Sequence, residues 1–224
     1  MKILAGLLFA LFLGPVASAQ SPVPIEREPR HHLTLENQYV RVFFVTILPG
    51  DVSLFHTHLR SGVSTRLTDA QIRDEPLQGK SEDLTVKRGA VTFARNATPL
   101  IHRVSNIGQT PFRNIFVEIL LPPGSTTTSS LSGAPGHELV LENDSVRVYR
   151  LTLAPGGSTG NHTHDARILT IAVTAGAIVV EQPGRKSSKM KLKEGDARWH
   201  EHGVLQTMRN AGTAPFEMIE IELR

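Results

Sequence analysis

The chain has 224 residues, no cysteine and a formal net charge of +3 at pH 7. Because it has no cysteine, it forms neither a disulfide nor a thiolate metal site, and its stability depends on the buried core that a chain of this length can form. The basic residues are scattered singly or in pairs rather than in a stripe interleaved with aromatic residues, which argues against a nucleic-acid partner.

The first nineteen residues have the pattern of a secretory signal peptide. Lys2 supplies the positive start, residues 3–13 form an apolar run, and Ala17-Ser18-Ala19 is a small-residue cleavage site. A membrane anchor is the alternative, but it needs roughly 20 apolar residues, and this run is shorter. No later segment of the sequence is long and apolar enough to span a membrane. We therefore expect cleavage of residues 1–19 after Ala19 and a secreted or periplasmic protein without a membrane span.

Two segments of biased composition divide the rest of the chain. Residues 20–30 are rich in proline and charge, which predicts an extended N-terminal arm. Residues 122–136 are rich in Ser, Thr, Gly and Pro, which predicts a linker. The predicted domains are therefore residues 31–121 and residues 137–224.

Both halves have the patterning of β-strands. Residues 146–153 and 216–223 alternate apolar with polar side chains, as half-buried strands do. Pro-Gly and Asn-x-Gly sequences mark turns between such segments, and strong helix signals are lacking. An all-β barrel or sandwich is therefore predicted in each half.

The two halves also repeat one another. The repeat is far longer than the units of roughly 20–50 residues that build a solenoid, so each copy is a small domain in itself. Matching residues lie at an offset of 106 in the first part of each half and of 104 in the second part. The pairs include Leu35/Leu141, Glu36/Glu142, Asn37/Asn143, Val40/Val146, Arg41/Arg147, Gly50/Gly156, His56/His162 and His58/His164, then Asn106/Asn210, Gly108/Gly212, Phe112/Phe216 and Glu118/Glu222.

A His-Thr-His sequence occurs once in each copy, at residues 56–58 and 162–164. In an extended strand alternate side chains point to the same face, so both histidines of each pair face the same way. Two imidazoles on one face form half of a metal site. A single His-x-His arises by chance and is often a surface feature, but two copies at equivalent places of a repeat favour a functional role.

These residues resemble the motifs of the cupin superfamily. The family's first motif reads G-x5-H-x-H, followed after three or four residues by E-x6-G, and its second reads G-x5-P-x-G-x2-H-x3-N. The resemblance covers roughly residues 30–224 and implies a bicupin, which is an all-β chain of two tandem double-stranded β-barrels of the cupin or jelly-roll type. The matching residues are Gly50, His56, His58, Gly89, His102 and Asn106 in the first half, and Gly156, His162, His164, Gly176, Gly195, Gly203 and Asn210 in the second.

The sequence departs from the family pattern at the ligand positions. In this alignment the motif glutamate is replaced by Val63 and by Leu169. The second-motif histidine is kept as His102, two residues later than the pattern, but is Gln206 in the second half. The resemblance implies a first metal site of His56, His58 and His102, and a second, weaker site of His162, His164 and Gln206.

Three neutral imidazoles suit a divalent transition metal (Zn, Fe, Cu or Ni) and leave positions open for water or substrate. Without the carboxylate the centre keeps the two positive charges of the ion, which favours a small anionic ligand or a bound hydroxide. The alternative is that the three histidines are buried polar residues with hydrogen-bond partners and no metal.

Two functions remain open from the sequence. One is an exported metal-binding protein with a three-histidine site in barrel 1, including a metal-dependent enzyme on a small molecule, such as a dioxygenase, hydrolase or isomerase of a small acid. The other is a non-catalytic binding or scaffolding bicupin of the cell envelope. The sequence assigns no catalytic residue, and it leaves both a monomer and a homodimer open.

The remaining candidate residues are expected to be structural. We expect His31, His32 and His137 at the surface, and Arg41 and Arg147 facing solvent or capping a sheet edge. Residues 199–202 are expected to form a barrel-rim loop shaped by the packing of Trp199. The alternative for this stretch is that His200 or His202 adds a ligand to the second site.

Overall fold

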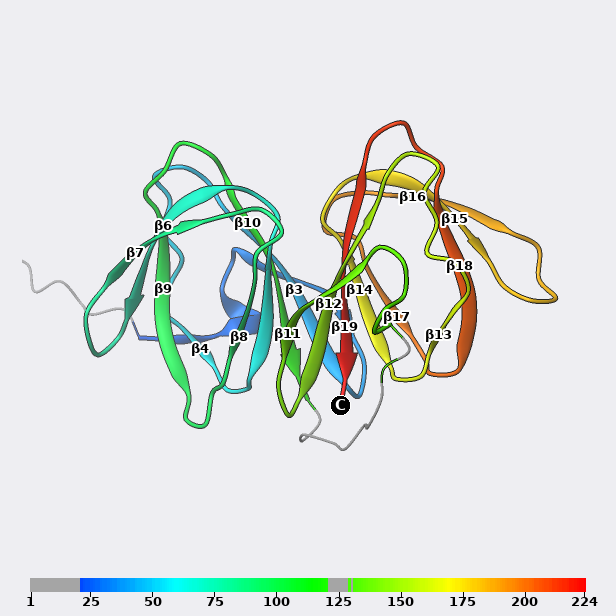
Figure 1. Cartoon of the computed structure of the whole chain (residues 1–224). Coiled ribbons are helices and arrows are strands. Elements are labelled where there is room, and N and C mark those ends of the chain that lie inside the picture. Colours follow the sequence, from blue (N-terminus) through cyan, green and yellow to red (C-terminus); the bar gives the residue numbers. More distant parts are fainter. Residues whose placement is uncertain (1–20, 121–128, 130) are drawn as a thin grey trace, which may run out of the picture.

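The computed structural model describes residues 21–120, residue 129 and residues 131–224. The predicted signal peptide and most of the predicted linker lie outside these residues. The described chain is all-β apart from one turn of 3-10 helix, η1 (Ile25–Arg27), and it forms two tandem barrels, as Figure 1 shows. Within it, no helix has the length and apolar character needed to cross a membrane.

The first barrel consists of two five-stranded sheets, with strand orders β1-β4-β9-β6-β7 and β2-β3-β10-β5-β8. Its strands are β1 (Val23–Pro24), β2 (His31–Glu36), β3 (Val40–Ile47), β4 (His56–His58), β5 (Gly62–Arg66), β6 (Ala70–Pro76), β7 (Glu82–Val86), β8 (Val91–Ala94), β9 (Leu100–Asn106) and β10 (Phe112–Ile119).

The second barrel repeats this topology except for β1, which has no counterpart among its described strands, with sheet orders β11-β12-β19-β14-β17 and β13-β18-β15-β16. Its strands are β11 (His137–Glu142), β12 (Val146–Leu153), β13 (His162–His164), β14 (Ile168–Ala172), β15 (Gly176–Glu181), β16 (Ser188–Leu192), β17 (Ala197–His200), β18 (Val204–Asn210) and β19 (Phe216–Leu223). The repeat in the sequence is therefore also a repeat in the fold.

The asparagine that ends each motif holds the end of its barrel together. Asn106 Nδ2 donates to the carbonyl oxygens of Ile47 (2.9 Å) and Thr110 (2.8 Å), while its Oδ1 accepts from the Gly108 amide (3.0 Å). Asn210 makes the same three bonds in the second barrel. A buried amide side chain that satisfies three backbone groups stabilises the turn, so this motif residue is structural.

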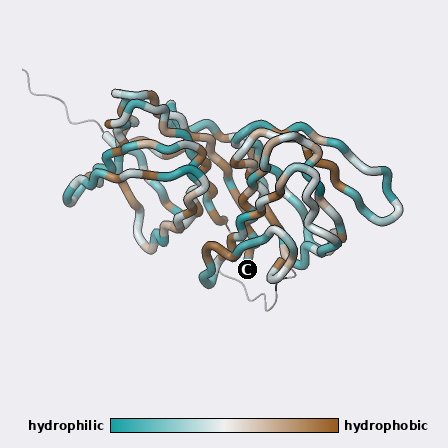
Figure 2. Tube along the Cα trace, turned by 45° about the horizontal axis from the view of Figure 1, so that its top comes forward, coloured by the Kyte–Doolittle hydropathy of each residue, from teal (hydrophilic) through white to brown (hydrophobic). Residues whose placement is uncertain are grey.

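The two barrels share one hydrophobic core. The sheet containing β3, β10 and β5 packs against the sheet containing β12, β19 and β14, and Figure 2 shows apolar residues along the strands where the barrels meet. Val63 and Leu169 are both fully buried there. Trp199 lies on strand β17 and stacks on Tyr39 of the first barrel with ring centroids 5.3 Å apart, so it packs between the barrels instead of shaping a rim loop.

The segment predicted as an N-terminal arm packs against the first barrel. Strand β1 pairs in parallel with β4, which places Val23 opposite His56. Ile25, in the 3-10 turn, is buried against Phe43 and Phe116. The apolar Ile25 therefore anchors this segment beside the strand that carries the His-Thr-His sequence.

We expect Val63→Glu to lower the free energy of unfolding by at least about 3 kcal/mol, because it places an unpaired carboxylate in the shared core. Leu59→Glu is the control, since Leu59 is 64% exposed and the change is expected to cost within about 0.5 kcal/mol. Urea unfolding of the three proteins measures the difference. A Val63→Glu protein as stable as the wild type would contradict the burial of this residue.

Candidate metal centre

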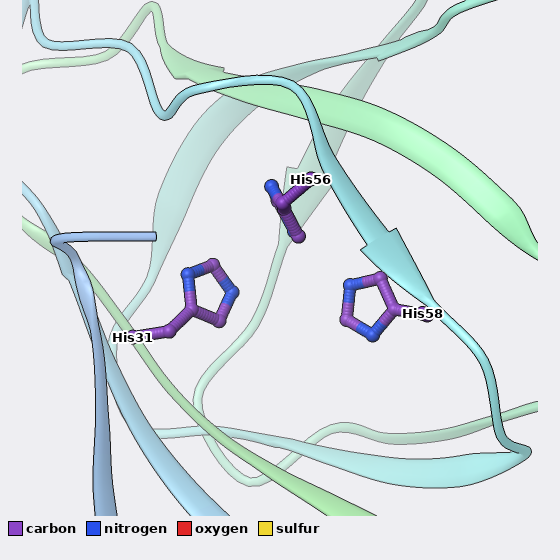
Figure 3. A group of neighbouring side chains, drawn as sticks. All are labelled: His31, His56 and His58. Atoms are coloured by element: carbon purple, nitrogen blue, oxygen red, sulfur yellow. The ribbon is translucent and has the colours of Figure 1, made fainter. Parts of the chain in front are cut away.

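Four histidine rings lie close together inside the first barrel. The centroid of the His56 ring lies 4.5 Å from that of His31, 4.9 Å from that of His58 and 4.7 Å from that of His102. The register of β4 against β9 explains part of this arrangement, because it places His56 directly opposite His102. His31, His56 and His58 each offer a ring nitrogen within 4.8 Å of the others, and Figure 3 shows the three rings around one space.

The structure thus brings His56, His58 and His102 together and adds a residue that we expected at the surface. His31 is 9% exposed and faces the cluster from β2, whereas the adjacent His32 is exposed, because alternate residues of a strand face opposite ways. One signal in the sequence could have found it, since His31 and His137 match at the repeat offset of 106.

Three of the rings are held at Nδ1 by a hydrogen-bond acceptor. His31 Nδ1 lies 2.6 Å from Glu28 Oε2, His56 Nδ1 lies 2.9 Å from the Leu54 carbonyl oxygen, and His102 Nδ1 lies 2.7 Å from Asp74 Oδ1. An acceptor at Nδ1 favours the tautomer with its proton there, which leaves a lone pair on Nε2. These contacts therefore orient three Nε2 atoms as donors for an electrophile.

Several ring nitrogens of the cluster are buried without a hydrogen-bond partner among the described residues. They are His56 Nε2, His58 Nδ1 and His102 Nε2. Burial, together with the neighbouring histidines, lowers the pKa of His56 to about 3 and that of His58 to about 2. Because these two rings are neutral at physiological pH, their lone pairs are free to coordinate a metal ion.

The carboxylates of Glu28 and Asp74 contact the outer side of the histidine rings, at Nδ1 of His31 and His102. Glu28 is 1% exposed and also accepts hydrogen bonds from the amides of Arg30 (2.7 Å) and Leu54 (3.1 Å). Burial acts to raise the pKa of Glu28, but the hydrogen bonds from His31 and the amides outweigh it and keep the pKa below its usual value. Glu28 therefore remains ionised and places a negative charge behind His31.

The two residues that the sequence alignment places at the motif glutamate do not face the cavities. Val63 and Leu169 point into the shared core and away from the cavities. The next residues along these strands, Ser64 and Thr170, face the cavities instead. The structure therefore provides no carboxylate on this strand in either barrel.

The rings line a cavity of about 210 Å³ in the first barrel. Much of its wall is apolar and includes Val45, Ile72 and Phe112. Several polar residues also line it, among them Arg66, Asp74 and Asn114, and Arg66 Nη1 donates to Asn114 Oδ1 at 2.7 Å. Burial lowers the pKa of Arg66 to about 10 although Asp74 opposes the shift, so the guanidinium stays charged at neutral pH.

The second barrel has a different polar cluster. The rings of His162 and His164 lie 5.2 Å apart, and Gln206 Nε2 lies 3.3 Å from His164 Nε2, so the three predicted residues do lie together. His200 faces His164 with ring centroids 5.7 Å apart, whereas His202 is exposed. Among the described residues, the group compact enough to share one ion lies in the first barrel and consists of His31, His56 and His58, with His31 in place of the predicted His102.

An ion pair that the sequence did not predict occupies part of the second cluster. The side chain of His137, expected at the surface, is fully buried, and its Nε2 lies 3.0 Å from Oε2 of the buried Glu220. Burial acts against both charges, but the contact raises the pKa of His137 and lowers that of Glu220. His137 is therefore held by Glu220 and not poised as a neutral donor.

The paired arginines of the repeat also differ from expectation. Arg41 is half-buried, and its Nε donates to Oε2 of the buried Glu118 at 2.8 Å. Arg147 is 8% exposed and its Nε donates to Glu142 Oε1 at 2.7 Å. Neither arginine faces solvent freely, and Arg41 supplies the counter-charge that the buried Glu118 carboxylate needs.

Comparison with known proteins supports this description of the fold. The model of the cupin domain matches residues 149–222. No curated protein sequence matches the chain significantly. The solved structure of AerE from Microcystis aeruginosa matches with a TM-score of 0.64 and 14% identity, over 91% of this chain and 98% of that chain.

Two further solved structures share the two-barrel fold. Protein Ylba from E. coli matches with a TM-score of 0.61 and 12% identity, over 93% of this chain and 88% of that chain. A mutant of salicylate 1,2-dioxygenase from Pseudoaminobacter salicylatoxidans, in complex with gentisate, matches with a TM-score of 0.59 and 13% identity, over 90% of this chain and 76% of that chain. Residues 149–222 match the cupin domain and the first half repeats the topology of the second, so the chain has the fold of two tandem barrels of the cupin type.

Proposed function

We propose that this chain is an exported protein whose first barrel binds one divalent transition metal, Zn, Fe, Cu or Ni, on His56, His58 and His102, with His31 as a further imidazole. The export rests on the signal-peptide pattern of residues 1–19, which predicts a secreted or periplasmic location. Two observations carry the metal site. Ring nitrogens of His56, His58 and His102 are buried without a hydrogen-bond partner, and those of His31, His56 and His58 lie within 4.8 Å of one another. Each such atom costs about 1–3 kcal/mol when it is left unsatisfied, and one ion would satisfy them together.

The chemistry of the surrounding residues fits such an ion. Metal-bound histidines commonly donate their other ring nitrogen to a carboxylate or a carbonyl, which is the role of Asp74, Glu28 and the Leu54 carbonyl here. Phe116 packs edge-on against His58 with ring centroids 4.6 Å apart and excludes water from that side. A bound metal would supply Lewis acidity or redox chemistry beside the cavity.

We further propose that the centre is that of a metal-dependent enzyme acting on a small acid. The cavity beside the rings gives a small molecule access to them. The name of one protein with this fold, salicylate 1,2-dioxygenase, assigns it oxidative chemistry on a small aromatic acid, which supports this class of substrate. Neutral imidazole ligands leave the two positive charges of a divalent ion uncompensated, and this charge also favours an anionic substrate.

The second barrel is proposed to support the first rather than to act itself. In the strand register Gln206 stands where the first barrel has His102, and Val180 stands where it has Asp74. The histidine and the carboxylate that orients it are thus lost together. The alternative, in which the whole chain is a non-catalytic envelope protein, is excluded if a turnover is found that disappears in a folded His102→Ala variant.

We expect purified mature protein to contain one transition-metal ion per chain and the His56→Ala/His58→Ala variant to contain almost none, because two of the donors are removed. Mass spectrometry of the metals measures the content. His32→Ala, which changes an exposed histidine beside His31, is the control and is expected to keep the metal. Sub-stoichiometric metal in the wild type that does not change in the double variant would rule out the site.

We expect Asp74→Asn to weaken metal affinity roughly 10- to 100-fold, because the amide holds the His102 ring less well and makes it a poorer donor. Competition with a chelator measures the affinity. Asp83→Asn is the matched control, because Asp83 is exposed and pairs with Arg73. Equal affinities for Asp74→Asn and wild type would show that Asp74 does not tune the site.

A further inference from the structure

Arg66 is a charged group in the first cavity that the metal site does not use. It lies at the end of β5, on the cavity-facing side with Ser64, and its guanidinium lies 5.5 Å from the centroid of the Phe112 ring. Its hydrogen bond to Asn114 Oδ1 uses one of the five donors of the guanidinium group. The remaining donors are available to a molecule in the cavity.

The charge of Arg66 lacks a carboxylate in contact with it among the described residues. Several other arginines of this barrel form an ion pair, such as Arg41 with Glu118 and Arg103 with Glu75. The acidic residue that acts on Arg66 electrostatically is Asp74, and its Oδ1 is taken by His102 Nδ1. A half-buried guanidinium without a contacting anion is incompletely compensated, so this arrangement is suited to an anion that enters the cavity.

The second barrel provides an internal comparison. The register of β5 with β10, and of β14 with β19, places Ala172 where the first barrel has Arg66 and Met218 where it has Asn114. Both replacements are buried in the second barrel's own hydrophobic cluster. The arginine and its amide partner are therefore absent from the barrel that also lacks His102 and Asp74, which links the four residues to one task.

We propose that Arg66 and Asn114 bind the carboxylate of a small organic acid, with the apolar body of the acid against Val45, Ile72 and Phe112. This inference rests on the proposed function, since it names the substrate class of the same cavity. A guanidinium group offers two parallel N–H donors that match the two oxygens of a carboxylate. Asn114 fixes the plane of the guanidinium and keeps an Nδ2 donor of its own. The volume of about 210 Å³ restricts the acid to a compact one.

The test uses benzoate as the probe and benzamide as its uncharged counterpart, with metal-loaded and metal-depleted mature protein. Calorimetry measures binding, and metal content is measured in parallel. We expect benzoate to bind wild type at least about 10-fold more tightly than benzamide, since charge-assisted hydrogen bonds are stronger than neutral ones. Arg66→Met is expected to weaken benzoate roughly 10- to 100-fold while its metal content stays unchanged.

Two variants and one ion complete the test. Arg73→Met, which removes an exposed arginine paired with Asp83, is the matched control and keeps wild-type affinity. Arg66→Lys keeps the charge but not the two-pronged geometry, and is expected to restore part of the affinity. Equal affinity of wild type and Arg66→Met, or of benzoate and benzamide, would overturn the inference. Sulfate that binds as tightly as benzoate would overturn the organic acid as the ligand.

The outcome is separable from that of the metal site. Benzoate binding that depends on Arg66 in metal-depleted protein supports the carboxylate subsite whatever the metal analysis gives. Conversely, protein with one metal per chain and no Arg66-dependent binding keeps the proposed function and overturns the carboxylate subsite.

Discussion

The central strands of this molecule each separate two environments, the core that the barrels share and a cavity. Side chains alternate between the two faces of such a strand. One face of β5 lies in the core that the barrels share, and the other lines a cavity. Val63 is fully buried in that core, whereas Ser64 and Arg66 line the cavity. A slip of one residue would exchange the two faces, so the contact between barrels fixes which side chains reach the cavity. The chemistry of the first barrel thus depends on packing against the second.

The donor groups of the candidate centre come from separate parts of the chain. The pairing of β4 with β9 provides His56 and His102, and β2 adds His31. Carboxylates then orient two of the rings, the buried Glu28 from the segment after η1 and the partly exposed Asp74 from β6. The N-terminal segment is anchored by Ile25, so its packing positions Glu28 as well. Ring orientation is therefore a consequence of how several elements pack around β4.

The two barrels have kept the same scaffold and changed their interiors. Asn106 and Asn210 make equivalent hydrogen bonds, and the sheets have corresponding strand orders. Inside, Phe116 of the first barrel corresponds in register to Glu220 of the second. Phe116 packs on a neutral histidine, whereas Glu220 pairs with His137. The second barrel thus holds an internal ion pair where the first has an aromatic ring, although it too buries two ring nitrogens without a hydrogen-bond partner, His162 Nε2 and His164 Nδ1.

The sequence by itself determined the β-class, the duplication and the likeness to cupins, because strand alternation and repeated motifs are local patterns. It also predicted that His56, His58 and His102 belong together. It did not place His31, Glu28 or Asp74, and it assigned the motif glutamate to positions that face the shared core. Only the tertiary structure decided these points, because they depend on which face of each strand meets the other barrel. The role of Arg66 was beyond the sequence for the same reason, since the lack of a contacting carboxylate becomes visible only when the described strands are brought together.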